Sequence, residues 1–162
     1  MLKFITHILN IFKKLRGGFQ MYISTERLPP EEFERFANQV ASIIFHKKIY
    51  TFAQGPDGGV DGIDDVLKPT IIVQSKRYQF RTSATKLRDL ILNEVEKIKS
   101  LAEKNNWNDF QYVLVTSGNL TPLAKIQIRE AAGKMMLSDN NIITENELSE
   151  LAKDGRLKPI FR

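Results

Sequence analysis

The chain has 162 residues, of which 42% are hydrophobic, and a formal net charge of +5. This length and composition suit one domain with a hydrophobic core, and the charge favours a polyanionic partner. The absence of cysteine excludes disulfides and thiolate zinc sites and fits a reducing cytoplasm. With His7 and His46 as the two histidines, a histidine-dependent nuclease or a serine–histidine hydrolase is hard to build.

Residues 1–20 differ in character from the rest of the chain. Their apolar side chains follow helical spacing among basic residues, which predicts a cationic amphipathic extension before a domain over residues 21–162. Lys13 and Lys14 cut the apolar run well short of a membrane span. Three roles stay open for this extension: contact with a membrane or partner surface, an extra helix packed on the domain, or a segment upstream of a true start at Met21.

The remainder of the chain alternates between helical and strand patterns. The expected elements, in chain order, are a helix from 30 with an apolar stripe reaching 44, strands over 47–54, 60–67 and 70–78, a helix over 83–104, a strand over 110–116, a helix over 122–134, a strand over 142–143 and a helix between 144 and 155. This order predicts an α/β fold in which helices flank a mixed sheet.

The most informative feature of the sequence is a predicted hairpin that carries three polar residues. Asp61 follows a glycine-rich turn, and Gln74 and Lys76 lie on one face of the next strand because side chains alternate along a strand. If Lys68-Pro69 is the tip of a tight hairpin, Asp61 falls opposite Lys76 and diagonal to Gln74. The carboxylate, the amide oxygen and the ammonium would then converge at a place that can hold a divalent cation and a phosphate.

The order Pro56-Asp57, Asp61, Gln74-Ser75-Lys76 resembles the PD-(D/E)xK nucleases, specifically the Mrr-like restriction endonucleases, in which glutamine commonly replaces the second acidic ligand. The resemblance covers residues 28 to 153, and the segment 31–37 is similar to the family's first helix, which contributes an acid to the site. It implies a restriction-endonuclease-like mixed β-sheet flanked by helices. Asp57 is more plausible as a turn former, or as a group that supports the ligands from behind, than as a ligand itself.

The resemblance also implies a metal-dependent DNA endonuclease. Asp61 would be the principal metal ligand and Gln74 the second. Glu34 on the first helix would assist, with Glu31 as the competing acid and solvent exposure as the other interpretation of Glu34. Lys76 would orient the attacking water or stabilise the transition state. Mg²⁺ is the expected ion because it prefers oxygen ligands, and Mn²⁺ is expected to substitute for it.

A basic segment after the motif, which contains Arg77, Tyr78, Arg81 and Lys86, is predicted to contact DNA phosphates. The expected role is anti-phage restriction in the cytoplasm, as a homo-oligomer or as part of a larger defence protein. An inactive nuclease-like module that binds DNA or another protein is the alternative. A membrane contact through residues 1–20 stays open.

Overall fold

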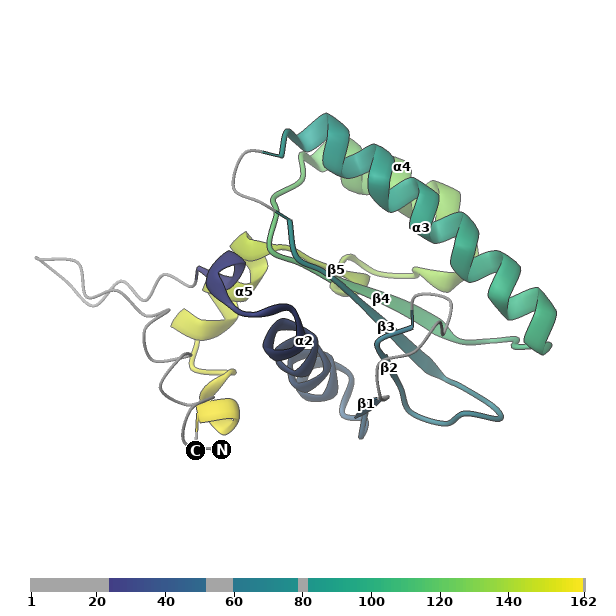
Figure 1. Cartoon of the computed structure of the whole chain (residues 1–162), viewed down its shortest axis with the longest axis horizontal. Helices are drawn as coiled ribbons and strands as arrows, with labels where there is room; N and C mark the ends of the chain where they lie inside the picture. Colours follow the sequence, from purple (N-terminus) through teal and green to yellow (C-terminus); the bar gives the residue numbers. More distant parts are fainter. Residues whose placement is uncertain (1–23, 52–59, 79–81, 162) are drawn as a thin grey trace, which may run out of the picture.

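The computed structural model describes residues 24–51, 60–78 and 82–161 (Figure 1). The helices of this part of the chain are α2 (Pro30–Phe45), α3 (Ala84–Asn105), α4 (Pro122–Ala132) and α5 (Glu145–Lys153), with short 3-10 turns η1 (Thr25–Arg27), η2 (Gly133–Met135), η3 (Asp139–Asn141) and η4 (Lys158–Phe161). Its strands are β1 (Tyr50–Thr51), β2 (Gly62–Ile63), β3 (Ile71–Lys76), β4 (Gln111–Thr116) and β5 (Ile142–Ile143). The predicted order of helices and strands is confirmed.

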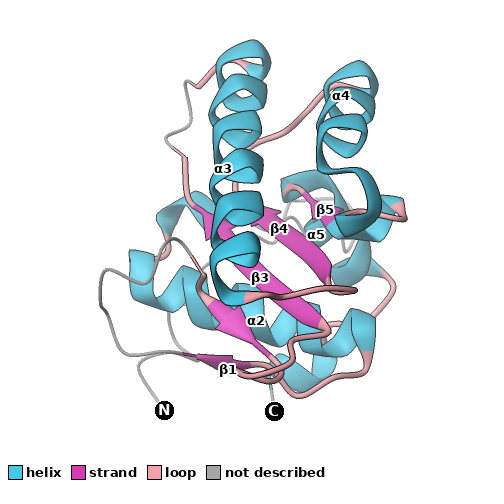
Figure 2. Cartoon of the chain, turned by 90° about the vertical axis from the view of Figure 1, so that its right-hand side faces the viewer, coloured by secondary structure: helices cyan, strands magenta, loops and turns pink. Residues whose placement is uncertain are grey.

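The five strands form one mixed sheet in the order β1-β2-β3-β4-β5. The pairs β1–β2 and β2–β3 are antiparallel, whereas β3–β4 and β4–β5 are parallel and are connected through α3 and α4. Helices α3 and α4 cover one face of the sheet, and α2 and α5 cover the other (Figures 1 and 2). The α/β fold predicted from the sequence, with a mixed sheet flanked by helices, is therefore the observed one.

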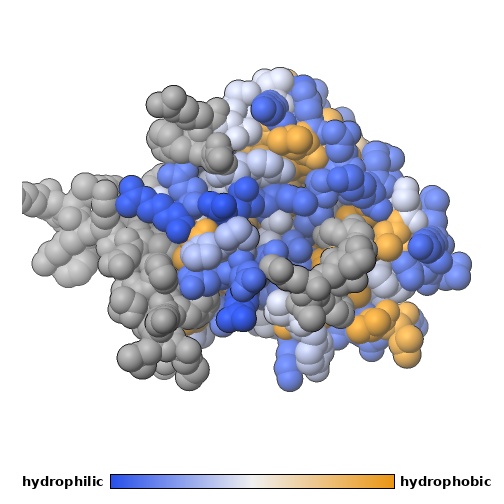
Figure 3. Space-filling model, in the orientation of Figure 1, coloured by the Kyte–Doolittle hydropathy of each residue, from blue (hydrophilic) through white to orange (hydrophobic). Residues whose placement is uncertain are grey.

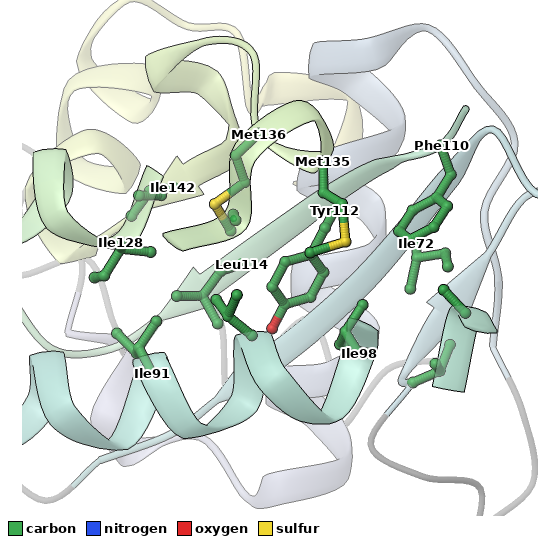
Figure 4. Close-up of a cluster of buried hydrophobic side chains, with 14 of the residues drawn as sticks. Ile72, Ile91, Ile98, Phe110, Tyr112, Leu114, Ile128, Met135, Met136 and Ile142 are labelled. Atoms are coloured by element: carbon green, nitrogen blue, oxygen red, sulfur yellow. The ribbon is translucent and has the colours of Figure 1, made fainter. Parts of the chain in front are cut away.

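Each face of the sheet has its own hydrophobic core, because side chains alternate along β3 and β4. Ile71 and Val73 pack toward α2 and α5, whereas Ile72 packs toward α3 and α4. Figure 4 shows the second core, in which the ring of Tyr112 lies among aliphatic side chains with its hydroxyl directed toward α3. The polar side chains of β3 that follow Val73 therefore also divide between two layers.

The hairpin formed by β2 and β3 differs from the predicted one. Gly62 pairs with Val73 and Ile63 with Ile72, so the predicted placement of Asp61 opposite Lys76 is wrong: continuing this register brings Asp61 level with Gln74. The register differs from the predicted one because the connection between β2 and β3 is longer than a two-residue turn.

Two acidic side chains build that connection. The Asp64 carboxylate accepts hydrogen bonds from the backbone N–H groups of Thr70 (2.8 Å) and Ile71 (2.9 Å). Asp65 accepts from the N–H groups of Leu67 (2.8 Å) and Lys68 (2.9 Å). These bonds form the loop that follows Ile63, so β2 is shorter than the predicted strand over 60–67.

Several predicted features lie outside the described residues: the N-terminal extension, the turn that contains Asp57, and Arg81. The predicted strand over 47–54 is described to Thr51, and the paired part is Tyr50–Thr51. Within the part of the chain that the structure describes, no helix is long and apolar enough to cross a membrane.

Candidate active site

Asp61 lies immediately before β2, where the sheet meets α2. Its backbone N–H donates to the carbonyl of Val73 (2.9 Å), and its own carbonyl accepts from Nδ2 of the buried Asn38 on α2 (2.9 Å). The next residue, Gly62, passes so close to α2 that a Cβ at this position would lie 2.1 Å from Asn38 Oδ1. Glycine therefore allows the close approach that fixes the backbone of Asp61.

Ser75 of β3 holds the Asp61 carboxylate through two hydrogen bonds. Oδ2 of Asp61 accepts from the backbone N–H of Ser75 (2.6 Å) and from the Ser75 hydroxyl (3.0 Å). Burial raises the pKa of Asp61 above its usual value, and nearby Glu94 adds to this, although the Ser75 hydrogen bonds and the charge of Lys76 act in the opposite direction. The negative charge of Asp61 is thus only partly compensated by the protein.

Glu34 faces the same region from α2. Burial is the main reason that its pKa is raised, and the charges of Asp61 and Glu31 raise it further while Lys76 lowers it. The structure therefore brings Glu34, Asp61 and Lys76 within electrostatic range of one another. Two neighbouring carboxylates whose pKa values are both raised are an arrangement that a divalent cation would relieve.

Gln74 is fully buried on β3, and both ends of its amide are engaged. Nε2 donates to Oε2 of Glu94 (2.7 Å), and Oε1 accepts from the Tyr112 hydroxyl. Because a carboxylate can only accept, this orientation of the amide is the one that satisfies Glu94. Ligation of a metal ion by Gln74 would require its oxygen to leave Tyr112, and the shared site of Asp61 and Gln74 stays a prediction.

Lys76 ends β3 beside α3. Its ammonium lies 3.2 Å from Oε2 of Glu94, whose other oxygen, Oε1, is 2.8 Å from Nζ of Lys97. The Lys76 side chain is 31% exposed and borders a surface hollow of about 620 Å³ along α3 that Lys97 and Lys104 also line. Lys76 is thus partly accessible while being held by a buried acid.

The sequence reasoning missed Glu94. It lies on the buried face of α3, three residues after Ile91 and four before Ile98, so an acid interrupts an otherwise apolar stripe. That interruption was the available signal, because an acid on a buried helix face requires a partner. Tyr112 could not be singled out in the same way, since a tyrosine in a buried strand is most often a core residue.

The predicted DNA-contacting residues fall into two groups. Arg77 and Lys86 are exposed, and Nη1 of Arg77 also donates to the carbonyl of Glu26 (2.9 Å). Tyr78 is half-buried: its N–H donates to the Ser117 hydroxyl (2.8 Å), and burial raises its pKa to about 12. Figure 3 shows that the visible face is mainly hydrophilic, with apolar residues in small separate patches.

The donor set fits an oxygen-ligated divalent ion. Within the described residues, no group of three or more His, Cys, Asp or Glu side chains is arranged to hold a metal. Mg²⁺, however, is commonly bound through one or two carboxylates and keeps several waters. Asp61 and Glu34 are two carboxylates of that kind, near enough for the charge of Asp61 to raise the pKa of Glu34.

Comparison with known proteins gives one family match. The Mrr catalytic-domain model, described as a restriction endonuclease, matches residues 25–146, a range that contains Glu34, Asp61, Gln74, Lys76 and Glu94. Over 126 residues the chain is 28% identical to "Uncharacterized protein y4cD" of Sinorhizobium fredii (strain NBRC 101917 / NGR234), and this match covers 78% of the chain. The chain spans only 19% of the length of that curated relative. No solved structure gave a significant match.

Proposed function

Because this chain belongs to the restriction endonuclease family defined by the Mrr catalytic domain, we propose that it is a metal-dependent endonuclease that hydrolyses phosphodiester bonds of DNA. The observation that carries the proposal is the convergence of Asp61, Glu34 and Lys76 at the end of β3, where two carboxylates and one ammonium influence one another electrostatically.

We assign a separate role to each residue of the proposed site. Asp61 would be the principal ligand of a Mg²⁺ ion, which Mn²⁺ would be able to replace, and Glu34 would assist from α2. When bound, the ion would polarise the scissile phosphate and favour formation of hydroxide from water. Lys76 would place its ammonium beside the phosphate, where negative charge develops in the transition state.

Gln74 is the proposed second ligand, through its amide oxygen. This role requires an exchange of partners, because Oε1 accepts from Tyr112. A neutral amide also binds Mg²⁺ more weakly than a carboxylate does. The engagement of the Gln74 oxygen by Tyr112 also supports the alternative function, an inactive nuclease-like module that retains the fold and binds DNA or another protein.

The wider assignments are proposals of the same kind. The proposed DNA contacts are to phosphates near the cut, made by Arg77, Tyr78, Arg81 and Lys86. Anti-phage restriction in the cytoplasm is the proposed biological role, carried out by a homo-oligomer or by a larger protein of which this domain is one part. Residues 1–20 are proposed to be a separate extension of the domain formed by residues 21–162.

A plasmid-nicking assay with Mg²⁺ and with Mn²⁺ tests the proposal. Cleavage should stop in EDTA, and Asp61→Asn and Lys76→Ala should each reduce it on the order of 100-fold or more. Excess Mn²⁺ should restore part of the activity of Asp61→Asn, which has lost a ligand charge, but none of that of Lys76→Ala.

The matched control is Lys68→Ala, which removes an exposed lysine from the loop at the opposite end of β3. This variant should cut at the wild-type rate, and thermal unfolding should show that all the variants are folded. Unchanged cleavage by Lys76→Ala would overturn the mechanism, and no cleavage by the wild-type chain under any metal condition would favour the inactive module.

A further inference from the structure

Glu94 is the centre of a polar network that connects three elements. Its Oε2 accepts from Nε2 of Gln74 and lies 3.2 Å from the ammonium of Lys76, and its Oε1 is paired with Lys97. Tyr112 extends the network from β4, because its hydroxyl donates to the oxygen of Gln74. One buried acid on α3 therefore contacts both β3 residues of the candidate site.

The network keeps Glu94 charged. Burial alone would raise its pKa, yet the hydrogen bond and charge of its two lysines, together with the amide of Gln74, hold that pKa below the usual value. Since Gln74 is neutral, the buried negative charge beside Lys76 on this face comes from α3 and not from β3. A buried carboxylate with several donors holds those donors in fixed positions.

We propose that Glu94 is a positioning residue of the candidate nuclease site, whose carboxylate fixes the ammonium of Lys76 at the end of β3 and orients the amide of Gln74. The inference rests on the proposed function for its effect on catalysis. Lys97 has a different part in the network, because it pairs with the other carboxylate oxygen, Oε1, from a side chain that is 62% exposed.

The kinetic test uses Glu94→Gln, which keeps the size of the side chain and removes its charge. With the full chain, kcat for plasmid nicking should fall at least 10-fold, while KM for DNA should change less than 3-fold. In the double variant Gln74→Glu with Glu94→Gln, the carboxylate and the amide exchange places and a negative charge stays beside Lys76. This exchange should recover most of the lost kcat, which a purely structural role of Glu94 would not predict.

A matched control lies on the same helix. Glu96→Gln makes the same chemical change at an acid that is exposed and pairs with Lys99. It should keep the wild-type kcat, and a loss comparable to that of Glu94→Gln would overturn the assignment.

A second measurement does not depend on cleavage. The rate at which an amine-acylating reagent modifies Lys76, followed by mass spectrometry, should rise several-fold in Glu94→Gln because the ammonium loses its buried partner. Glu96→Gln should leave that rate unchanged, and Lys76→Ala confirms the assignment of the modified peptide.

The two measurements separate the failure of each proposal. If the wild-type chain does not cut DNA but Lys76 becomes more reactive in Glu94→Gln, the positioning stands and the proposed nuclease activity fails. If the wild-type chain cuts and Glu94→Gln cuts equally fast, the nuclease stands and the positioning role is overturned. An unchanged reactivity of Lys76 overturns the positioning in either case.

Discussion

Gln74 is a neutral residue between a hydroxyl and a carboxylate. A primary amide suits this position because it offers a donor at one end and an acceptor at the other. Burial raises the pKa of Tyr112 well above its usual value, so that its hydroxyl stays protonated and donates to Gln74. The hydroxyl, the amide and the carboxylate of Glu94 are thus ordered in one direction, with the negative charge beside Lys76.

Replacing Gln74 by Glu should therefore destabilise the protein in the absence of metal. The new carboxylate would face Glu94 at the position where an N–H now donates over 2.7 Å. Loss of this bond and burial of a like charge should lower the free energy of unfolding by about 2 kcal/mol or more. Urea unfolding in EDTA measures this change, and added Mg²⁺ should recover part of it if the new acid becomes a ligand.

The control for this substitution is Gln39→Glu, which places the same change at an exposed position of α2 and should alter stability little. A Gln74→Glu variant as stable as the wild-type protein without metal would show that the amide does not face Glu94.

At the scale of single residues, the sequence was informative about candidate site residues that belong to one short motif. Asp61 and Lys76 belong to a single hairpin, and the acid on the first helix was placed by resemblance, so Glu34 could be anticipated. Glu94 lies eighteen positions after Lys76 on another element, and its contacts with Gln74 and Lys76 depend on how α3 packs on the sheet. No local pattern encodes that packing.

The elements around Asp61 are held together by the close approach of β2 to α2 and not by long strand pairing. β2 pairs over Gly62–Ile63 alone and is fixed to α2 through Asn38, whose Nδ2 donates to Asp61 and to Thr51. The order of these elements was predictable from periodicity. The register of β2 on β3 could not be predicted, because it depends on hydrogen bonds that the Asp64 and Asp65 side chains make within the connecting loop.

Gly62→Ala should separate β2 from α2. The added Cβ would lie 2.1 Å from Asn38 Oδ1 and 2.6 Å from Cγ2 of Ile49, so the strand or the helix must move. Such overpacking costs about 1–3 kcal/mol, and it should also reduce nicking activity at temperatures where the variant is folded, because Asp61 moves with its neighbour.

Gly118→Ala provides the comparison for this change. A Cβ there would meet Leu87 Cδ2 at 2.5 Å, with the next atoms at 3.7 Å, and the end of a leucine side chain can rotate. Its loss of stability in urea unfolding should be smaller. Equal stability of Gly62→Ala and the wild-type protein would contradict the close approach of β2 and α2.

Across the whole molecule, the candidate site draws on both layers that flank the sheet. Glu34 comes from α2 on one face, whereas Glu94 comes from α3 on the other, and both act electrostatically on Lys76 at the end of β3. Both cores must therefore be formed before these charges can act together. The chain segment that begins at Ser24 adds a contact of its own, between η1 and α5.

Glu145 at the start of α5 makes that contact and should give the protein a pH-dependent stability. Its buried carboxylate accepts from the backbone N–H of Thr25 (2.8 Å) and from the Thr25 hydroxyl. Burial is the largest effect and raises the pKa of Glu145 to about 7, with a further contribution from the charge of Glu26. An unfolded glutamate has a pKa of about 4.5, so between pH 4.5 and 7 the folded protein holds a proton that the unfolded chain has released.

The contribution of Glu145 to the free energy of unfolding should therefore fall as the pH rises from 4.5 to 7 and stay low above it. Glu145→Gln keeps an acceptor for the Thr25 N–H and removes the titration. The variant should be more stable than the wild-type protein at pH 8, on the order of 3 kcal/mol, and the difference should vanish near pH 4.5.

Urea unfolding at several pH values measures the difference in stability between Glu145→Gln and the wild-type protein. The control is Glu150→Gln, at an exposed acid of α5 paired with Lys153, which should leave the wild-type pH dependence unchanged. If the stability difference between Glu145→Gln and the wild-type protein is the same at every pH, Glu145 does not titrate in this range and the segment at Thr25 is held without a pH-sensitive contact.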